Sequence, residues 1–148
     1  ELVELILKRL RPIAKQRNID VLYESAREVF AEIDEVKLTL AISNLVENAI
    51  KYNKEYGYVK VSLDADHQFA TIMVEDNGIG IPEEAQEHIF ERFYRVDKSH
   101  SREIGGTGLG LAIARNAILL HRGSIKIDSE EGQGTVFTVK IPIIYVSK

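Results

Sequence analysis

The sequence contains no cysteine and no run of 18 apolar residues. Without cysteine there are no disulfides and no thiolate metal sites, which fits a reducing compartment. Without a long apolar run we expect no membrane-spanning helix, and no signal peptide is visible. The 4 histidines are scattered through the chain and lack the spacing of metal ligands.

The net charge is also small, at -4 over 148 residues, so nothing favours a nucleic-acid partner. A small triphosphate remains compatible, because backbone dipoles and a few cations can hold one. The length predicts one domain, and 45% hydrophobic with 28% charged residues is typical of globular proteins. The chain opens inside an amphipathic segment with no initiator Met, so we expect a piece of a longer protein.

The order of expected elements predicts a two-layer α/β sandwich, a mixed, mostly antiparallel sheet with helices on one face. Asp34 is the expected N-cap of the helix over 35–54. Pro12 is expected to cause an irregularity in the helix over 1–17. Gly123 is the expected C-cap of the helix over 112–121. Helices are expected over 1–17, 35–54 and 112–121, with a short one from Pro82. Strands are expected over 18–25, 29–33, 57–65, 68–75, 124–129 and 135–141, the last two joined by a hairpin at 130–134.

A polar stripe runs along the helix expected over 35–54. At 100° per residue, Asn44, Asn48, Lys51 and Tyr52 fall on a different arc from the apolar positions. A solvated helix face explains this pattern. Two asparagines four residues apart nevertheless reduce helix propensity, which favours a functional role. The stripe alone leaves both interpretations open.

A carboxylate ends the strand expected over 68–75. Period-two alternation places Asp76 on the same inner face as Ala70, Ile72 and Val74. A buried carboxylate is costly unless it is paired or hydrogen-bonded. The glycines of residues 76–80 then allow a sharp turn and a close approach of the backbone to a ligand. A simple tight turn explains the same stretch equally well.

Four glycines in residues 105–110 precede the last helix, after a polar loop over 95–106. Free N–H groups at a helix start make a phosphate cradle plausible. No Gly-Lys-Ser/Thr follows, so this is no Walker loop, and no strand precedes it, so it is no dinucleotide fingerprint. A glycine-rich hinge explains the loop equally well when it is considered alone.

Together and in this order, the motifs resemble the catalytic and ATP-binding domain of sensor histidine kinases. That domain belongs to the GHKL superfamily, with gyrase, large heat-shock chaperone and mismatch-repair ATPases. The resemblance covers nearly the whole chain and implies a Bergerat-type sandwich. Residues 45–52 look like the N box of the family, and residues 90–95 look like its F box. Residues 76–80 and 106–111 look like its first and second glycine boxes, and residues 132–135 look like its small glycine motif.

The resemblance implies a site for ATP and Mg²⁺. Asp76 would accept a hydrogen bond from the exocyclic amine of adenine, whereas guanine would present a repelled carbonyl. Asn48 would hold Mg²⁺ through its amide oxygen, and Lys51 and Arg95 would act with it in catalysis at the phosphates. The implied nucleotide-binding set is Asn44, Asn48, Lys51, Tyr52, Asp76, Gly78, Gly80, Ile81, Arg95, Gly106, Thr107, Gly108, Leu109, Gly110, Leu111 and Thr135.

Asn44 argues for a kinase rather than a hydrolase. Related ATPases have a water-activating glutamate four residues before the magnesium asparagine, whereas an amide cannot act as general base. Glu47 lies about 100° from Asn48 on the helix, so we do not give it that role. Lys98, Arg102 and His100 are better explained as residues of a solvated loop.

The phosphoryl acceptor is expected outside this chain. None of the histidines (His67, His88, His100 and His121) sits in the helical pattern of the family's phosphoacceptor. The resemblance implies two partners: the dimerisation domain of the same protein, which carries the histidine, and the receiver domain of a response regulator. It also implies that this domain lies in the cytoplasm and is monomeric when isolated. The full-length protein would be a homodimer anchored in the cell membrane. The alternatives are an ATP-hydrolysing ATPase or chaperone, and an interaction module that binds no nucleotide.

Overall fold

The computed structural model describes residues 2–25, 34–66, 68–86, 88–90 and 110–142. Five strands form one sheet in the order β1-β2-β3-β5-β4, in which only β1 and β2 pair in parallel. The strands are β1 (Asp20–Ser25), β2 (Tyr58–Ala65), β3 (Phe69–Asp76), β4 (Ser124–Glu130) and β5 (Gly134–Pro142). The helices are α1 (Leu2–Gln16), α2 (Glu35–Lys51), α3 (Glu83–Gln86) and α5 (Gly110–Leu120).

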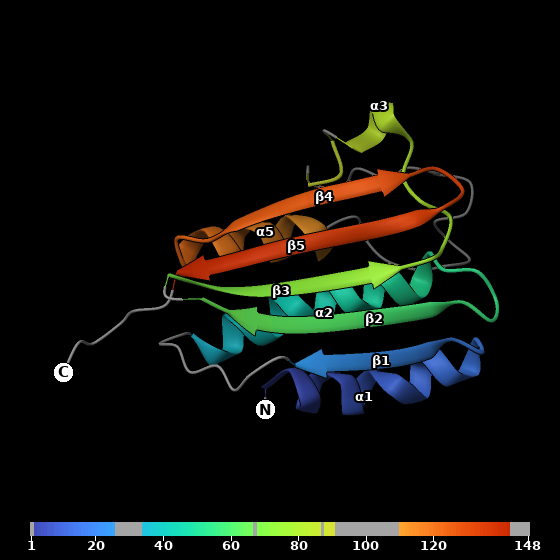
Figure 1. Ribbon diagram of the computed structural model, residues 1–148, viewed down its shortest axis with the longest axis horizontal. Coiled ribbons are helices and arrows are strands. Elements are labelled where there is room, and N and C mark those ends of the chain that lie inside the picture. Colours follow the sequence, from blue (N-terminus) through green and yellow to red (C-terminus); the bar gives the residue numbers. More distant parts are fainter. Residues whose placement is uncertain (1, 26–33, 67, 87, 91–109, 143–148) are drawn as a thin grey trace.

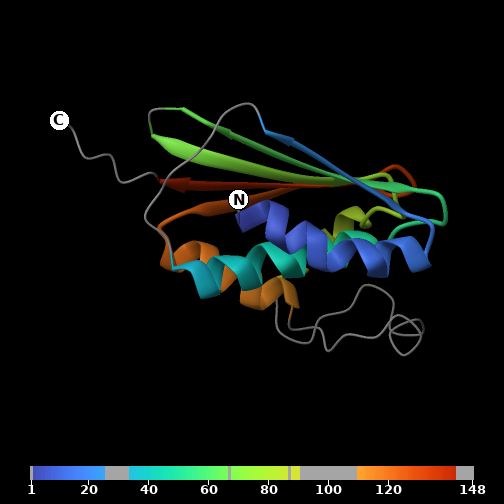
Figure 2. The same ribbon diagram turned by 90° about the horizontal axis from the view of Figure 1, so that it is seen from below.

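Helices α1, α2 and α5 cover one face of the sheet, which confirms the predicted two-layer sandwich (Figures 1 and 2). The apolar sides of these helices pack on the inward-facing positions of the strands, so the core lies between the two layers. The central strand β3 shows the predicted alternation, with Ala70, Ile72 and Val74 buried in the core and Met73 exposed. Asp76 therefore ends a row of core side chains.

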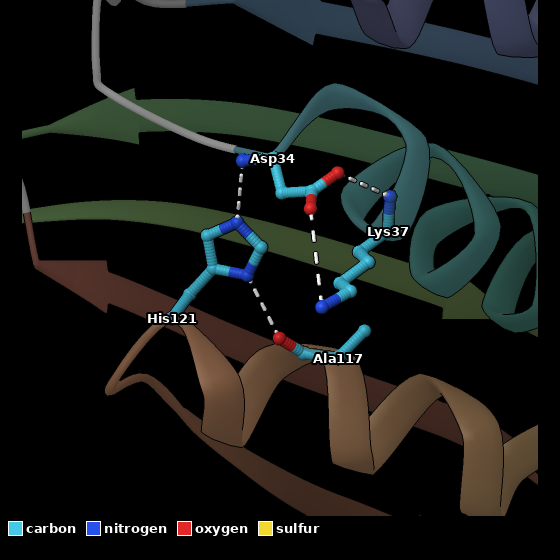
Figure 3. Close-up of polar contacts among 4 residues, drawn as sticks. All are labelled: Asp34, Lys37, Ala117 and His121. Atoms are coloured by element: carbon cyan, nitrogen blue, oxygen red, sulfur yellow. Dashed lines mark hydrogen bonds and ion pairs between the residues drawn. The ribbon is translucent and has the colours of Figure 1, made fainter.

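The start of α2 is attached to the end of α5 (Figure 3). The backbone N–H of Asp34 donates to Nε2 of His121 at 2.9 Å, and Nδ1 of the same ring lies 2.8 Å from the carbonyl oxygen of Ala117. In this arrangement Nε2 is the acceptor of the ring, and Nδ1 is the nitrogen that faces an acceptor. Asp34 is the predicted N-cap and accepts from the backbone N–H of Lys37 at 3.1 Å.

Several helix ends differ from the sequence-based expectation. Helix α2 ends at Lys51 rather than at residue 54, because Tyr52 is the C-cap at φ -99 and ψ 20. Helix α5 begins at Gly110 rather than at residue 112. The left-handed residue after α5 is Arg122, at φ 62, and not Gly123. Gly123 has another role, since a Cβ there would lie 2.4 Å from the carbonyl oxygen of Lys140.

Two further expectations concern the first third of the chain. Helix α1 continues through Pro12, which lies inside its bounds. The strand expected over 29–33 falls outside the described residues. Within the described ranges, no helix has both the length and the apolar character needed to cross a bilayer.

Candidate functional site

Asp76 is the buried charged group of the site, with its side chain at the end of β3. It is 9% exposed, and its Oδ1 accepts a hydrogen bond from the backbone N–H of Gly78 at 2.9 Å. Burial raises the pKa of Asp76 to about 6 and the charge of Glu75 adds to the rise, whereas the N–H groups of Gly78 and Thr135 lower it. The site therefore holds a carboxylate that is only partly compensated by protein hydrogen bonds.

The turn after Asp76 packs against the end of α2. The backbone N–H of Ile79 donates to the carbonyl oxygen of Tyr52 at 3.2 Å. A Cβ on Gly78 would lie 2.5 Å from that oxygen and 2.8 Å from Cα of Asn53. Glycine is thus required here by close packing against the backbone of α2, whereas the sequence analysis expected a close approach to a ligand. The turn is joined to the helix that carries the polar stripe.

The β4–β5 hairpin holds the other side of the turn. Gly80 has a φ of 72, and a Cβ there would lie 2.2 Å from the carbonyl oxygen of Glu130. The backbone N–H of Gly132 donates to the carbonyl oxygen of Ile79 at 2.7 Å. Thr135 is 5% exposed and pairs with Asp76 across the strands. The hairpin therefore brings Thr135, Gly80 and Asp76 together.

Ser129 connects this hairpin to the turn, which the sequence analysis did not predict. Its Oγ accepts from the backbone N–H of Ile81 at 2.8 Å and lies 2.8 Å from Oγ1 of Thr135. Gln86 donates through Nε2 to the carbonyl oxygens of Ile81 and Ser129, both at 3.0 Å. The position of Ile81 is thus fixed by two side chains from other elements.

The polar stripe lies on α2, where Asn44, Asn48 and Lys51 are half-buried and Tyr52 caps the end. Nδ2 of Asn44 is the one buried side-chain donor in the described part of the chain that has no hydrogen-bond partner. A Cβ on Gly110 would lie 3.8 Å from the side-chain carboxamide of Asn44. The start of α5 is therefore beside the stripe, as the resemblance requires.

Two asparagines that sequence reasoning passed over organise the chain between the stripe and the turn. Asn53 is 5% exposed, and its Nδ2 donates to the carbonyl oxygen of Tyr58 at 2.8 Å. Oδ1 of Asn77 accepts from the backbone N–H of Tyr58 at 2.8 Å. An asparagine just after a helix and one in an Asp-Asn-Gly turn are both signals of side-chain-to-backbone bonding.

Part of the predicted site falls outside the described residues. This holds for Arg95, Gly106, Thr107, Gly108 and Leu109, and for the loop over 95–106. Leu111 lies in the first turn of α5 and is half-buried. In the F box, the ring of Phe90 packs edge-on against Phe137 with centroids 6.2 Å apart, which attaches this segment to the core.

Residues 33–144 match the family described as histidine kinase-, DNA gyrase B- and HSP90-like ATPase. The chain belongs to this family. The match covers the polar stripe, the carboxylate turn and the glycine hairpin, and it begins after α1 and β1. The matched range thus includes the three features that the structure brings together.

The curated relatives are sensor kinases. The chain is 44% identical over 147 residues to sensor histidine kinase RppB from Synechocystis sp., covering 99% of this chain and 32% of RppB. It is 47% identical over 118 residues to sensor histidine kinase WalK from Bacillus subtilis, covering 78% of this chain and 19% of WalK. The chain thus spans about a third or less of the length of these relatives.

Solved catalytic domains share the fold. The nucleotide-free catalytic domain of histidine kinase ThkA superposes with a TM-score of 0.83 at 31% identity, covering 96% of this chain and 90% of that one. Full-length ShkA in complex with AMPPNP superposes with a TM-score of 0.83 at 27% identity, covering 99% of this chain and 30% of ShkA. The two-layer sandwich is therefore that of histidine kinase catalytic domains.

The residues present fit a nucleotide. The buried carboxylate of Asp76 can accept a further hydrogen bond from a ligand. The buried Nδ2 of Asn44 has no hydrogen-bond partner among the described residues and can donate to one. Among the described residues there is no cluster of three His, Cys, Asp or Glu side chains that could hold a metal alone. A magnesium site at Asn48 would depend on phosphate oxygens and water, as is usual for nucleotide-bound Mg²⁺.

Proposed function

We propose that this domain binds ATP with Mg²⁺ and supplies the γ-phosphoryl group to a histidine on a separate dimerisation domain of the same sensor kinase. The observation that carries the proposal is Asp76, a buried and under-compensated carboxylate at the end of the central strand. The relatives named as sensor histidine kinases and the ShkA complex with AMPPNP support it. AMPPNP has an adenine base and a chain of three phosphorus atoms.

Asp76 would select the base. Its ionised carboxylate accepts from the exocyclic amine of adenine, whereas guanine presents a carbonyl oxygen at that position. The amine would add a hydrogen bond to a carboxylate that, among the described residues, accepts from the N–H groups of Gly78 and Thr135. Gly78 and Gly80 let the turn after Asp76 pack closely on the carbonyl oxygens of Tyr52 and Glu130, so the turn beside the carboxylate is held between α2 and the β4–β5 hairpin.

Asn48, Lys51 and Arg95 would act at the phosphates. The amide oxygen of Asn48 is a hard ligand suited to Mg²⁺, and the metal supplies charge neutralisation between the phosphates. Lys51, at the last position of α2, and Arg95 would balance further negative charge. The N–H groups of residues 106–110 would contact the triphosphate.

The transfer itself needs a nucleophile from outside this chain. A nitrogen of the acceptor histidine attacks the γ-phosphorus, an N–P bond forms, the bond to the β–γ bridging oxygen breaks, and ADP leaves. Asn44 occupies the place of the water-activating glutamate and cannot take a proton. Its half-buried side chain is instead a hydrogen-bond donor, so slow hydrolysis is expected.

The partners follow from the same comparisons. ThkA was solved in complex with the response regulator TrrA, at 28% identity and a TM-score of 0.78 to this chain. We infer that the histidyl phosphate made with this domain passes to the receiver domain of a response regulator. We also infer that the full-length protein is a membrane-anchored homodimer with this domain in the cytoplasm, and that the isolated domain is monomeric.

Phosphoryl transfer is tested with ATP labelled at the γ-phosphate. The full-length protein should incorporate label that is stable to base and labile to acid, as a phosphohistidine is. The isolated chain should bind ATP, incorporate no label, and release phosphate at no more than about one per minute. Release by the isolated chain at many per minute would instead establish the alternative, an ATP hydrolase of the same superfamily.

A further inference from the structure

Helix α1 lies outside the family match, yet two arginines at its middle and its end bond to α2. Nη2 of Arg9 donates to Oγ of Ser43 at 2.6 Å, next to Asn44 in the polar stripe. Nη1 of Arg17, just after α1, donates to the carbonyl oxygens of Ile50 and Lys51 at 2.8 and 2.6 Å. Helix α1 therefore contacts both the middle and the C-terminal turn of the helix that carries the site.

The Arg17 contact adds a side-chain donor to the carbonyl groups at the C-terminal end of α2. The last four carbonyl groups of an α-helix have no intrahelical donor, and a cation there also interacts favourably with the helix dipole. At the end of α2, the backbone N–H of Tyr52 donates to the carbonyl oxygen of Asn48 at 3.1 Å, and that of Asn53 donates to the carbonyl oxygen of Ile50 at 3.3 Å. Arg17 thus adds donors from outside the helix to the carbonyl groups of Ile50 and Lys51.

The same turn of α2 is joined to the carboxylate turn. The carbonyl oxygen of Tyr52 accepts from the backbone N–H of Ile79 at 3.2 Å. A second contact ties the α1–β1 connection to the chain after α2, where Nδ2 of Asn18 donates to Oε2 of Glu55 at 3.1 Å. A continuous set of hydrogen bonds therefore runs from Arg17, through residues 50–52, to the turn that follows Asp76.

We propose that Arg17 is a positioning residue of the nucleotide site, which acts by fixing the backbone of residues 50–52. The inference rests on the proposed function, because Lys51 is the residue expected at the phosphates. Loss of the Arg17 contacts frays the last turn of α2 and displaces Lys51 and Tyr52. Asp76 keeps its own bonds from Gly78 and Thr135, so recognition of the base is retained.

The proposal predicts that Arg17→Met has a different effect from a matched substitution on α1. Arg11→Met removes the same charge from an exposed position that makes no polar contact within the described ranges. Arg17→Lys is the rescue variant, because an ammonium has three donors and can serve the two carbonyls that one Arg17 nitrogen serves. Each variant is compared with the unchanged chain.

The first measurement is amide hydrogen exchange without nucleotide, so it does not depend on the proposed function. Arg17→Met should accelerate exchange of the Tyr52 and Ile79 amides by about fivefold, while Arg11→Met leaves them unchanged and Arg17→Lys restores them. Unchanged exchange at both amides in Arg17→Met would overturn the proposal. Equal acceleration at core amides of β3 would also overturn it, because the effect would then be global destabilisation.

The second measurement compares affinities for ATP with Mg²⁺ and for adenosine. Arg17→Met should weaken ATP binding by about fivefold and adenosine binding by less than about twofold, with recovery in Arg17→Lys. Equal losses for both ligands would contradict a role at the phosphate end. If the unchanged chain binds neither ligand, the proposed function fails, and the exchange result alone then decides whether Arg17 fixes residues 50–52.

Discussion

The backbone N–H of Gly78 donates a 2.9 Å hydrogen bond to Oδ1 of Asp76, two residues earlier in the chain. The carboxylate therefore closes its own turn while remaining 9% exposed at the end of a row of core side chains. Burial raises its pKa from 3.8 to about 6, so the ionised form costs folding free energy at neutral pH. A ligand that donates a hydrogen bond to Asp76 would offset this cost.

Asp76→Asn should weaken ATP binding and at the same time stabilise the ligand-free fold. The amide oxygen still accepts from Gly78, but the charge that attracts the amine of adenine is lost, so ATP affinity should fall by at least about a hundredfold. The free energy of unfolding of the ligand-free protein at pH 7 should rise by about 1–3 kcal/mol, because the buried charge is gone. Calorimetric titration and denaturant unfolding measure the two quantities.

The control for this substitution is Asp128→Asn, at an exposed position of β4. It should leave ATP affinity and stability nearly unchanged. If Asp76→Asn instead lost both folding and binding, Asp76 would be a structural residue rather than a recognition residue.

The pKa of Asp76 predicts how binding depends on pH. The folded pKa of about 6 lies above the unfolded value of 3.8, so the ligand-free protein should lose stability as pH rises through this window. Affinity for the base should show the opposite trend. It should be constant above about pH 7 and weaken about tenfold per unit well below pH 6, because only the ionised carboxylate accepts the amine.

Adenosine is the suitable probe for this trend, because it has no phosphate that titrates in the same range. Its affinity is measured at several pH values for the unchanged chain. A flat profile down to about pH 5 would show that Asp76 is either ionised throughout or absent from the base contact.

Gly78→Ala should damage the site more than Gly132→Ala. A Cβ at Gly78 would meet the carbonyl oxygen of Tyr52 at 2.5 Å, so the turn and the end of α2 must separate. A Cβ at Gly132 meets nothing within 4 Å, and the substitution there is strained only by a φ of 85, which costs about 1–2 kcal/mol. We expect ATP affinity to fall more than tenfold for Gly78→Ala and less than about threefold for Gly132→Ala. Similar affinities of the two variants would mean that the junction of the turn with α2 is not part of the site.

Asn48→Ala should reduce binding of ATP mainly when Mg²⁺ is present. Truncation removes the amide oxygen proposed as a metal ligand but leaves the base contact at Asp76. We expect a loss of about tenfold with Mg²⁺ and of less than about twofold with a chelator present. Titrations under both conditions measure the ratio, and equal losses would remove Asn48 from the metal site.

The sheet and the face of Asp76 could be predicted because both follow from local periodicity. Alternation in β3 fixed the inward row that ends at Asp76, and the glycines marked the turns. The contact of Asp34 with His121 could not be predicted in this way, because the residues are 87 positions apart and one partner is a backbone N–H. The same holds for Arg17 and the carbonyl groups of α2, since periodicity reports which face is buried and not which backbone groups lack donors.

The left-handed residue after α5 is Arg122 and not the expected Gly123, and the reason is again a tertiary contact. A glycine after a helix predicts a C-cap, but here the glycine is required by the carbonyl oxygen of Lys140 on β5. In the same way, the role of Ser129 depends on a hairpin that meets the turn after β3 from a different part of the chain. Such contacts are set by the tertiary arrangement rather than by local sequence.

The central claim is that Asp76 lies in an adenine-selective nucleotide site. Calorimetric titration of the chain with ATP and with GTP, each with Mg²⁺, tests it most directly. We expect one ATP to bind per chain and GTP to bind at least about a hundredfold more weakly. Equal affinities for the two nucleotides, or no binding of ATP at millimolar concentration, would contradict it.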